Sequence, residues 1–272
     1  MRVGSLFTGI GGIDLGLECA GMEIAWQIEN DPVCQAILQR RWPDVELHND
    51  VRRKMRLAEV DMVAGGFPCQ PVSTAGRRLG EADPRWLWPQ FLKIIKQAQP
   101  RWVFIENVEG LRVRGLGSVL KGLAESGYDA EWDCLPAHIV GAPHARFRYW
   151  IVANRNGDGS YWTRLHEGER PSVFQLAREG WSRLSSNGTS ALGTSAYPHS
   201  ARFQRLGSKR KLCQVAPEVA VSRFGWWESE PHVGRVVYGI PNRVDRIRQL
   251  GNSAVPQLVE VIGRAILAAD GS

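Results

Sequence analysis

The sequence predicts an α/β fold, in which a mostly parallel sheet with flanking helices is joined to a smaller region of irregular or β-rich structure. Over residues 1–154, short apolar runs alternate with amphipathic stretches of helical length, which is typical of consecutive strand–helix–strand units. From Asn154 onwards the chain becomes rich in Gly, Ser, Asn and Arg, and the apolar periodicity fades until about Gly234. These two textures predict two domains.

Seven apolar runs within residues 1–154 predict the strands of the sheet. They cover residues 3–7, 24–29, 47–51, 61–64, 102–106, 130–135 and 147–153. Amphipathic stretches between them predict helices over residues 12–20, 32–41, 89–97 and 118–125. No helical pattern separates the last two strands, so we expect them to form an antiparallel pair at one edge of the sheet.

The end of the chain carries one more helical pattern. Residues 255–269 are amphipathic, with Pro256 in the first turn of the predicted helix. Such a helix needs an apolar surface to cover, and the predicted sheet offers one. We therefore expect a discontinuous first domain of residues 1–154 and 236–272, with residues 155–235 inserted as the second domain.

The charge of the chain indicates the kind of partner it binds. The net charge is +6, and residues 155–235 hold twelve Arg and Lys against seven Asp and Glu, 12 − 7 = +5. A basic excess gathered in one region favours a polyanionic partner such as nucleic acid.

Composition excludes several other classes of protein. A hydrophobic fraction of 43% supports a globular core. The sequence has neither an apolar run of membrane-spanning length nor a signal peptide, so we expect a cytoplasmic protein without membrane association. Its five cysteines include no C-x-x-C pair, so no metal site is predicted.

A glycine-rich turn, Phe7-Thr8-Gly9-Ile10-Gly11-Gly12, connects the first predicted strand to the first helix. Glycines at such a turn let the backbone approach a ligand, although many glycine turns are only tight connections. A dinucleotide fingerprint would need glycine at Asp14, which disfavours a nicotinamide cofactor. Glu29 and Asp50 end the next two strands at the same edge of the sheet, where open α/β folds bind ligands. Together these features predict a nucleoside pocket, with Glu29 for ribose hydroxyls and Asp50 for an adenine amino group.

A cysteine with two flanking prolines, in the segment Gly65-Gly66-Phe67-Pro68-Cys69-Gln70-Pro71, follows the fourth predicted strand. A single cysteine is most often a core residue. A loop at the carboxyl end of a strand is, however, a position for reactive groups, which makes Cys69 a candidate nucleophile.

These segments resemble the motifs of the DNA cytosine-5 methyltransferases of the bacterial or phage type. The Cys69 segment resembles the Pro-Cys-Gln motif of that family, and residues 5–17 resemble its cofactor motif. Three further motifs follow in the family's order, namely Glu106-Asn107-Val108, Arg146-Phe147-Arg148 and Gly251-Asn252-Ser253-Ala254-Val255-Pro256. The resemblance spans about 190 of the 272 residues, everything except the middle region.

The resemblance implies a Rossmann-like class I methyltransferase domain, a target-recognition domain at residues 155–235, and S-adenosylmethionine as cofactor. The residues implied to bind the cofactor are Phe7, Gly9, Ile10, Gly11, Gly12, Glu29, Asp50, Pro68, Asn252 and Ser253. Those implied in catalysis are Cys69, Glu106, Asn107, Arg146 and Arg148, and those implied to contact DNA are Gln70, Ser73, Arg77, Arg78 and Arg85.

The chemistry of cytosine suggests a role for each catalytic residue. Carbon 5 is too weak a nucleophile to accept a methyl group directly, but addition of the Cys69 thiolate at carbon 6 raises the electron density there. Glu106 would donate a proton at N3, and Arg148 would hold the cytosine O2. Arg146 would orient Glu106, and Asn107 would brace the cysteine loop.

The expected substrate is a cytosine extruded from duplex DNA, bound by a monomer that works apart from any cognate restriction endonuclease. Residues 70–88 would close over the DNA. Two positions and one segment depart from the family pattern. His144 and Asn30 replace a usual glutamine and a large apolar residue, and residues 241–246 stand where another family motif is usual, which affects the boundary near residue 235.

Three other functions compete with this interpretation. A tRNA cytosine-5 methyltransferase of the same fold would keep every catalytic motif, although the basic insert favours duplex DNA. A DNA-binding protein that has lost catalysis is disfavoured by the intact Cys69, Glu106 and Arg148. A nicotinamide oxidoreductase would explain neither Cys69 nor the insert.

Overall fold

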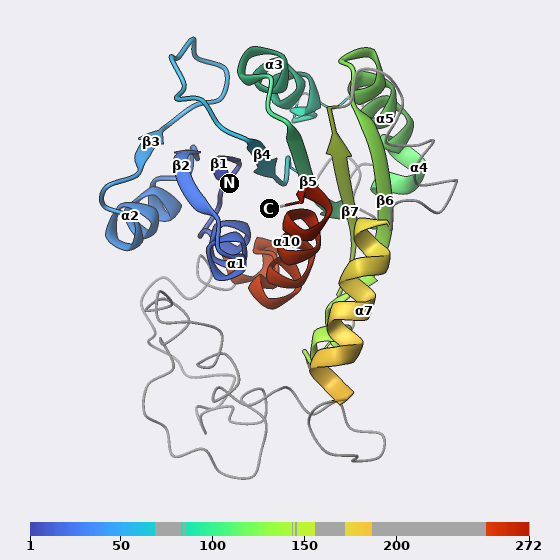
Figure 1. The fold of residues 1–272 in the computed structure, drawn as a ribbon. Helices are drawn as coiled ribbons and strands as arrows, with labels where there is room; N and C mark the ends of the chain where they lie inside the picture. Colours follow the sequence, from blue (N-terminus) through green and yellow to red (C-terminus); the bar gives the residue numbers. More distant parts are fainter. Residues whose placement is uncertain are drawn as a thin grey trace.

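A seven-stranded mixed sheet forms the centre of the molecule in the computed structural model (Figure 1). The structure describes residues 1–68, 83, 85–142, 144, 146–155, 172–186 and 249–271, with no side-chain detail for residues 181–186. The strand order is β3-β2-β1-β4-β5-β7-β6. Strands β1 to β5 are parallel, whereas β7 pairs antiparallel with both β5 and β6. The predicted α/β class and the antiparallel edge pair are therefore confirmed.

The strands lie where the apolar runs predict them, with ends shifted by at most three residues. They are β1 (Arg2–Leu6), β2 (Glu23–Ile28), β3 (Glu46–His48), β4 (Met62–Gly65), β5 (Trp102–Val108), β6 (Asp129–Pro136) and β7 (Phe147–Asn154). The largest shift is in β3, which ends at His48, so Asp50 lies in the loop beyond the strand. A short 3-10 helix, η2 (Ala137–Val140), follows β6.

Helices cover both faces of the sheet (Figure 1). They are α1 (Gly12–Ala20), α2 (Pro32–Arg41), α3 (Trp88–Ala98), α4 (Leu111–Arg114), α5 (Leu116–Glu125), α7 (Val173–Ser186) and α10 (Pro256–Asp270). Helices α1, α7 and α10 lie on one face, and α3 and α5 lie on the other. Residues 249–252 also form a helical turn just before α10.

Each face of the sheet has its own hydrophobic core. Alternating side chains of a strand point to opposite faces, so Phe104 packs toward α10 while Val103 and Ile105 pack toward α3 and α5. Phe104 stacks on Trp150 of β7, with ring centroids 5.5 Å apart. Burial on both faces explains why these strands read as continuous apolar runs in the sequence.

The C-terminal helix α10 covers the sheet, as its amphipathic pattern predicts. It packs directly against α1, and a Cβ atom added at Gly16 of α1 would lie 2.4 Å from Val259 Cβ. At its other end, the Trp102 indole nitrogen donates to Asp270 Oδ1 at 2.8 Å. Helix α10 is thereby fixed to β5 and to the helix that follows the glycine turn.

Part of the middle region packs on the sheet domain, which the fading periodicity did not predict. Helix α7 contacts α10 and β6, and its residues Val173 and Phe174 belong to the same core as α10. The buried Glu131 of β6 accepts the backbone N–H of Val173 at 2.9 Å, which holds the start of this helix. In the described part of the chain, no helix is long and apolar enough to cross a membrane.

Candidate active site at the carboxyl edge of the sheet

The carboxyl ends of the parallel strands bring four motifs to one edge of the sheet. Leu6 of β1 pairs with both Ile28 of β2 and Gly65 of β4, and Gly65 pairs with Ile105 of β5. The residues that follow these strands, namely the glycine turn, Glu29, the segment before Cys69, and Glu106, are therefore neighbours. This is the edge at which open α/β folds bind ligands.

The glycine turn has open space in front of Gly9. Gly9 has a φ of +57°, a left-handed conformation that favours glycine, and a Cβ atom added there would meet nothing within 4 Å. Its backbone N–H donates to Glu29 Oε2 at 2.7 Å. Phe7 also has a positive φ of 53°, and its ring stacks on Phe91 of α3. Gly9, Phe7 and Glu29 thus form one cluster, with half-buried Ile10 beside it.

The other two glycines of the turn serve packing within the protein. A Cβ atom on Gly12 would lie 2.2 Å from Ser253 Oγ and 2.7 Å from the Ala254 carbonyl oxygen. A Cβ atom on Gly11 would lie 2.5 Å from the ring of Trp42. Their α-carbons face the segment before α10 and the end of α2, and contact of their backbone with the cofactor stays a prediction.

Glu29 and Asp50 differ in their surroundings. Glu29 is 8% exposed, and its two carboxylate oxygens accept backbone N–H groups of Gly9 and Asp31. Asp50 is half-buried and accepts the Arg52 N–H at 2.9 Å. It lines an open polar hollow of about 400 Å³ with residues of α2 and of 47–55, and neither Gly9 nor Glu29 is among the lining residues.

A buried polar network lies beneath the glycine turn, and the sequence did not predict it. Asp14 of α1 accepts a hydrogen bond from Ser5 Oγ at 2.6 Å and another from Gln27 Nε2 at 2.6 Å. The Ser5 hydroxyl also bonds with the Thr8 hydroxyl at 3.0 Å. Burial raises the pKa of Asp14 to about 6, although both hydrogen bonds act in the opposite direction. The network ties the turn to β1 and β2.

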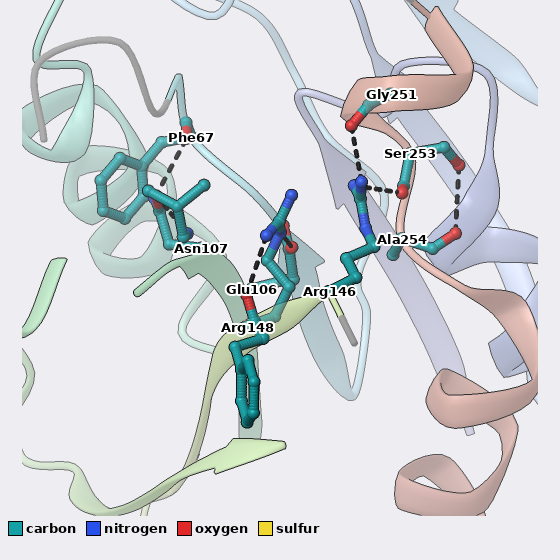
Figure 2. Close-up of polar contacts among 10 residues, drawn as sticks. Phe67, Glu106, Asn107, Arg146, Arg148, Gly251, Ser253 and Ala254 are labelled. Carbon is teal, nitrogen blue, oxygen red and sulfur yellow. Dashed lines mark hydrogen bonds and ion pairs between the residues drawn. The ribbon is translucent and has the colours of Figure 1, made fainter. Parts of the chain in front are cut away.

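Glu106 is the buried acid of the site. It is 8% exposed, and Arg148 Nε lies 2.9 Å from its Oε1 (Figure 2). The two groups form an ion pair. Burial raises the pKa of Glu106, while the charges of Arg148 and Arg146 oppose the shift. Burial therefore shifts Glu106 toward its protonated form, which is the form that a proton donor requires.

The sheet register explains how Glu106 and Arg148 meet. Glu106 pairs with Trp150 across the antiparallel strands, and Val108 pairs with Arg148. Glu106 and Arg148 are therefore diagonal neighbours on one face, which is within reach of a long side chain. Asn107 points to the opposite face.

Asn107 and Glu106 both contact the segment that leads to Cys69. Asn107 Nδ2 donates to the Phe67 carbonyl at 3.1 Å, two residues before Cys69 (Figure 2). A Cβ atom on Gly66 would lie 2.9 Å from Glu106 Oε2, so glycine is needed for this close approach. The half-buried Pro68 is the last described residue of the segment. Cys69 itself lies outside the described residues.

Arg146 contacts the segment that precedes α10. Its two terminal nitrogens donate to the carbonyls of Gly251 and Ser253, at 2.8 and 2.7 Å (Figure 2). Its φ of 30° is unusual for a residue with a side chain. Arg148 forms the ion pair with Glu106, and Arg146 acts on the acid through its charge, so a role of Arg146 in orienting Glu106 stays a prediction.

Of the remaining expected residues, three are described by the structure and four are not. Asn252 is exposed and Ser253 is half-buried beside Gly12. Arg85 is exposed, and its guanidinium forms two hydrogen bonds, of 2.9 and 2.7 Å, with the buried Asp83. Gln70, Ser73, Arg77 and Arg78 lie outside the described residues, as do residues 156–171 and 187–248. Within the described ranges, no cluster of His, Cys, Asp and Glu could hold a metal ion.

The comparisons with known proteins match this arrangement. Residues 1–194 match the family model of the C-5 cytosine-specific DNA methylases. The Type II methyltransferase M.AquIA of Picosynechococcus sp. is 34% identical over 177 residues, covering 56% of this chain and 71% of that protein. The Type II methyltransferase M.NaeI of Lentzea aerocolonigenes is 28% identical over 320 residues, covering 99% of this chain and 75% of that protein. A solved structure of a candidate DNA modification methyltransferase encoded within an E. coli prophage has 18% identity and a TM-score of 0.60, covering 100% of both chains, which shows a shared fold.

Proposed function

The chain belongs to the C-5 cytosine-specific DNA methylases, and from this membership we propose how its residues divide the work of methylating carbon 5 of cytosine in DNA. The proposal depends on one observation above all. The buried acid Glu106 and its neighbour Asn107 both contact residues 66–67, immediately before the cysteine of the Pro-Cys-Gln segment. A nucleophile and a proton donor on adjacent strand ends are what this reaction needs.

Cys69 is the nucleophile in this proposal. Its thiolate adds to carbon 6 of the cytosine and converts carbon 5 into an enamine carbon that can accept a methyl group. Addition places negative charge at N3, where protonated Glu106 donates its proton. After methylation, removal of the carbon 5 hydrogen by a base or water restores the double bond and expels the Cys69 thiolate.

Arg148 and Asn107 position these groups. The Arg148 guanidinium holds the Glu106 carboxyl from one side and can hold the cytosine O2 with its remaining N–H groups. Asn107 fixes the Phe67 carbonyl and so restrains the start of the cysteine loop. The cytosine must leave the base stack to reach them, because the ring face is covered in a duplex.

We further propose that S-adenosylmethionine is the cofactor, which when bound supplies an electrophilic sulfonium methyl group. The residues of the turn fit such a ligand, because space is open in front of Gly9 and the buried Glu29 carboxylate lies beside it. Each carboxylate oxygen has a second lone pair after accepting one backbone N–H, so Glu29 can still accept ribose hydroxyls. Phe7, Ile10, Pro68, Asn252 and Ser253 would complete this site. Asp50 would contact the adenine from the loop after β3.

The division into domains is also part of the proposal. Residues 1–154 and 236–272 would form the catalytic domain, and residues 155–235 would form the target-recognition domain that meets duplex DNA. The packing of α7 on α10 and β6 indicates that residues 172–180 belong with the catalytic domain. Gln70, Ser73, Arg77 and Arg78 would contact DNA, whereas the pairing of Arg85 with Asp83 leaves its guanidinium less available for phosphate.

The relatives named Type II methyltransferases support a role in restriction–modification, with a separate endonuclease as the cognate partner. A monomer acting on chromosomal DNA in the cytoplasm is the simplest form of this role. Methylation of tRNA is the alternative that the catalytic residues alone would allow. Methyl transfer to duplex DNA, measured beside transfer to tRNA, distinguishes them.

Trapping of the covalent intermediate tests the mechanism. Bisulfite sequencing of DNA from expressing cells identifies the target, and the same duplex is then made with 5-fluorocytosine at the target position. Fluorine cannot leave as a cation, so the methylated adduct should stay bound to Cys69 and survive denaturing electrophoresis when S-adenosylmethionine is present. Cys69→Ala should abolish the adduct.

Cys134 supplies the matched control for this experiment. It is a half-buried cysteine of β6 that lies opposite Tyr149 of β7 in the sheet, one residue from Arg148. Burial raises the pKa of its thiol. Cys134→Ala should trap DNA like the wild type. A denaturation-resistant complex formed by Cys69→Ala, or its loss in Cys134→Ala, would show that the nucleophile is misassigned.

A further inference from the structure

The helical turn of residues 249–252 is held against the proposed cofactor site from two directions. On one side, Arg146 binds the carbonyls of Gly251 and Ser253. On the other side, Gln249 inserts its amide at the start of α2 and is only 8% exposed, whereas its neighbour Leu250 is 67% exposed. The burial of a polar side chain beside an exposed leucine indicates a specific contact, because apolar burial alone would favour the reverse.

Gln249 makes two hydrogen bonds of opposite polarity. Its Nε2 donates to Asp31 Oδ2 at 2.9 Å, and its Oε1 accepts the Cys34 thiol at 2.9 Å. An amide side chain carries one donor group and one acceptor group on the same carbon, which suits this arrangement at any pH. The two contacts join positions 218 and 215 residues apart in the chain.

Asp31 transmits this contact to the glycine turn. Its Oδ1 caps α2 by accepting the Val33 N–H at 2.9 Å, and its own N–H donates to Glu29 Oε1 at 2.8 Å. The other oxygen of Glu29 accepts the Gly9 N–H. An uninterrupted series of hydrogen bonds therefore leads from Gln249 through Asp31 and Glu29 to Gly9.

We propose that Gln249 is a positioning residue that fixes Asp31 and, through it, the Glu29 carboxylate for binding of the cofactor ribose. The C-terminal segment and the first β–α–β unit then act as one preorganised site rather than as two surfaces that meet when the ligand arrives. This inference rests on the proposed cofactor site. It adds a residue whose own side chain touches neither the cofactor nor the substrate.

The contact can be tested by changing the amide of Gln249 to a carboxylate. In Gln249→Glu, the new carboxyl faces the Asp31 carboxylate directly, with Cys34 on its other side and Glu29 beyond Asp31. Two carboxylates at hydrogen-bond distance cannot both ionise without repulsion, so the contact survives only when one of them holds a proton. The effect of the substitution should therefore depend on pH, which loss of packing alone would not produce.

Titration calorimetry with S-adenosylmethionine, without DNA, gives the required measurement. At pH 8, Gln249→Glu should weaken cofactor binding about tenfold or more relative to the wild type, and at pH 5.5 the difference should shrink to about threefold or less. Adding Asp31→Asn to Gln249→Glu should restore binding at pH 8, because an asparagine amide can donate to the new carboxylate. Leu250→Glu places the same charge on the exposed neighbour and should leave affinity within about twofold.

Gln249→Met provides a second test, because it fills the same space without a donor or a new charge. Its affinity should fall about tenfold at both pH values, and thermal unfolding verifies that each variant is folded. Wild-type affinity in Gln249→Met, or no restoration by Asp31→Asn, would overturn the positioning role while leaving the proposed function intact. Absence of S-adenosylmethionine binding by the wild type would instead overturn the proposed cofactor.

Discussion

At the scale of single residues, backbone strain marks the site as clearly as the side chains do. Three non-glycine residues in the described part of the chain have a positive φ, namely Phe7, Gln99 and Arg146. Gln99 ends helix α3, which is a common place for this conformation. Phe7 and Arg146 belong to two of the motifs that the sequence analysis singled out. A strained conformation persists only where the surroundings enforce it, so both residues are held in place by their contacts.

The raised pKa of Glu106 predicts a pH dependence of the methyl transfer. A proton donor is lost as pH rises through its pKa, and burial moves that pKa above the ordinary range for glutamate. The rate measured in single turnovers should therefore decline on the alkaline side of this raised value. Glu106→Gln should lower the rate by about 10²- to 10⁴-fold and remove that decline.

Arg148→Gln supplies the companion measurement. The charge of Arg148 lowers the pKa of Glu106, so its removal should move the decline to higher pH while also slowing the reaction. If the rate of Glu106→Gln still declined at alkaline pH as in the wild type, another group would be responsible for that decline. No change of the profile in Arg148→Gln would mean that the ion pair does not act on the acid.

At the scale of secondary-structure elements, the packing of α1 on α10 determines where the glycine turn lies. Both Gly12 and Gly16 are on the α1 face that meets the last part of the chain, and Gly16 approaches the Pro256 carbonyl closely. Side chains at these positions would push α10 away from α1. The first turn of α1 opens the proposed cofactor site, so this helix pair links the end of the chain to its beginning.

Two glycine-to-alanine substitutions within helices test this packing. Alanine is the better helix former, and Gly180 of α7 has nothing within 4 Å of an added Cβ, so Gly180→Ala should stabilise the protein by about 0.5–1 kcal/mol. At Gly16 the added Cβ would meet Val259 Cβ at 2.4 Å and the Pro256 carbonyl at 2.5 Å. Gly16→Ala should therefore destabilise by about 1–3 kcal/mol despite its better propensity. Urea unfolding of both variants measures the difference, and stabilisation by Gly16→Ala would contradict the packing.

Most elements could be predicted from the sequence because their signals are local. Helices α1 and α2 have the predicted bounds, and the antiparallel edge follows from the missing helix between β6 and β7. Contacts between distant segments have no such signal. Nothing in the sequence distinguishes Gly9, which faces open space, from Gly12, which faces Ser253. The contact of Arg146 with Gly251 and the burial of Gln249 are likewise properties of the folded chain.

The middle region shows a different limitation for a whole element. Helix α7 was not predicted although its apolar residues have helical spacing, because the Gly-, Ser- and Arg-rich sequence on either side of it was interpreted as one irregular region. Its stability comes from packing of Val173 and Phe174 into the core beside α10 and from the contact of Glu131 with its first turn. The local signal of α7 and its tertiary contacts therefore agree, and the sequence could have predicted this helix.

At the scale of the whole molecule, the buried carboxyl groups make the stability of the fold depend on pH. Asp14 is completely buried beneath the glycine turn, and Glu106 is almost completely buried at the edge of the sheet. In both, burial raises the pKa, so ionisation is harder in the folded state than in the unfolded state. Ionisation of these two carboxyl groups near neutral pH therefore lowers the stability of the fold. Asp14 lies at the proposed cofactor site, and Glu106 lies at the proposed cytosine site.

Substitution of Asp14 allows the contribution of one buried carboxyl group to the pH dependence of stability to be measured. Below its ordinary pKa of 3.8 the group is protonated in both states, and between 3.8 and the folded value of about 6 only the unfolded state ionises fully. The free energy of unfolding should therefore fall as pH rises through this window, by up to about 3 kcal/mol, and stay level above it. Asp14→Asn removes the titration, so the difference in stability between variant and wild type should increase in favour of the variant from pH 4 to pH 7.

Ser5→Ala extends the same test. In the wild type, the Ser5 hydroxyl lowers the pKa of Asp14 by hydrogen bonding. Without that hydroxyl, the folded pKa should rise and the window should reach to higher pH. Urea unfolding at intervals of half a pH unit follows all three proteins. Parallel stability curves for the wild type and Asp14→Asn would show that the buried carboxyl does not titrate in this range. In that case the turn would be held by an ionised Asp14 whose hydrogen bonds from Ser5 and Gln27 outweigh its burial.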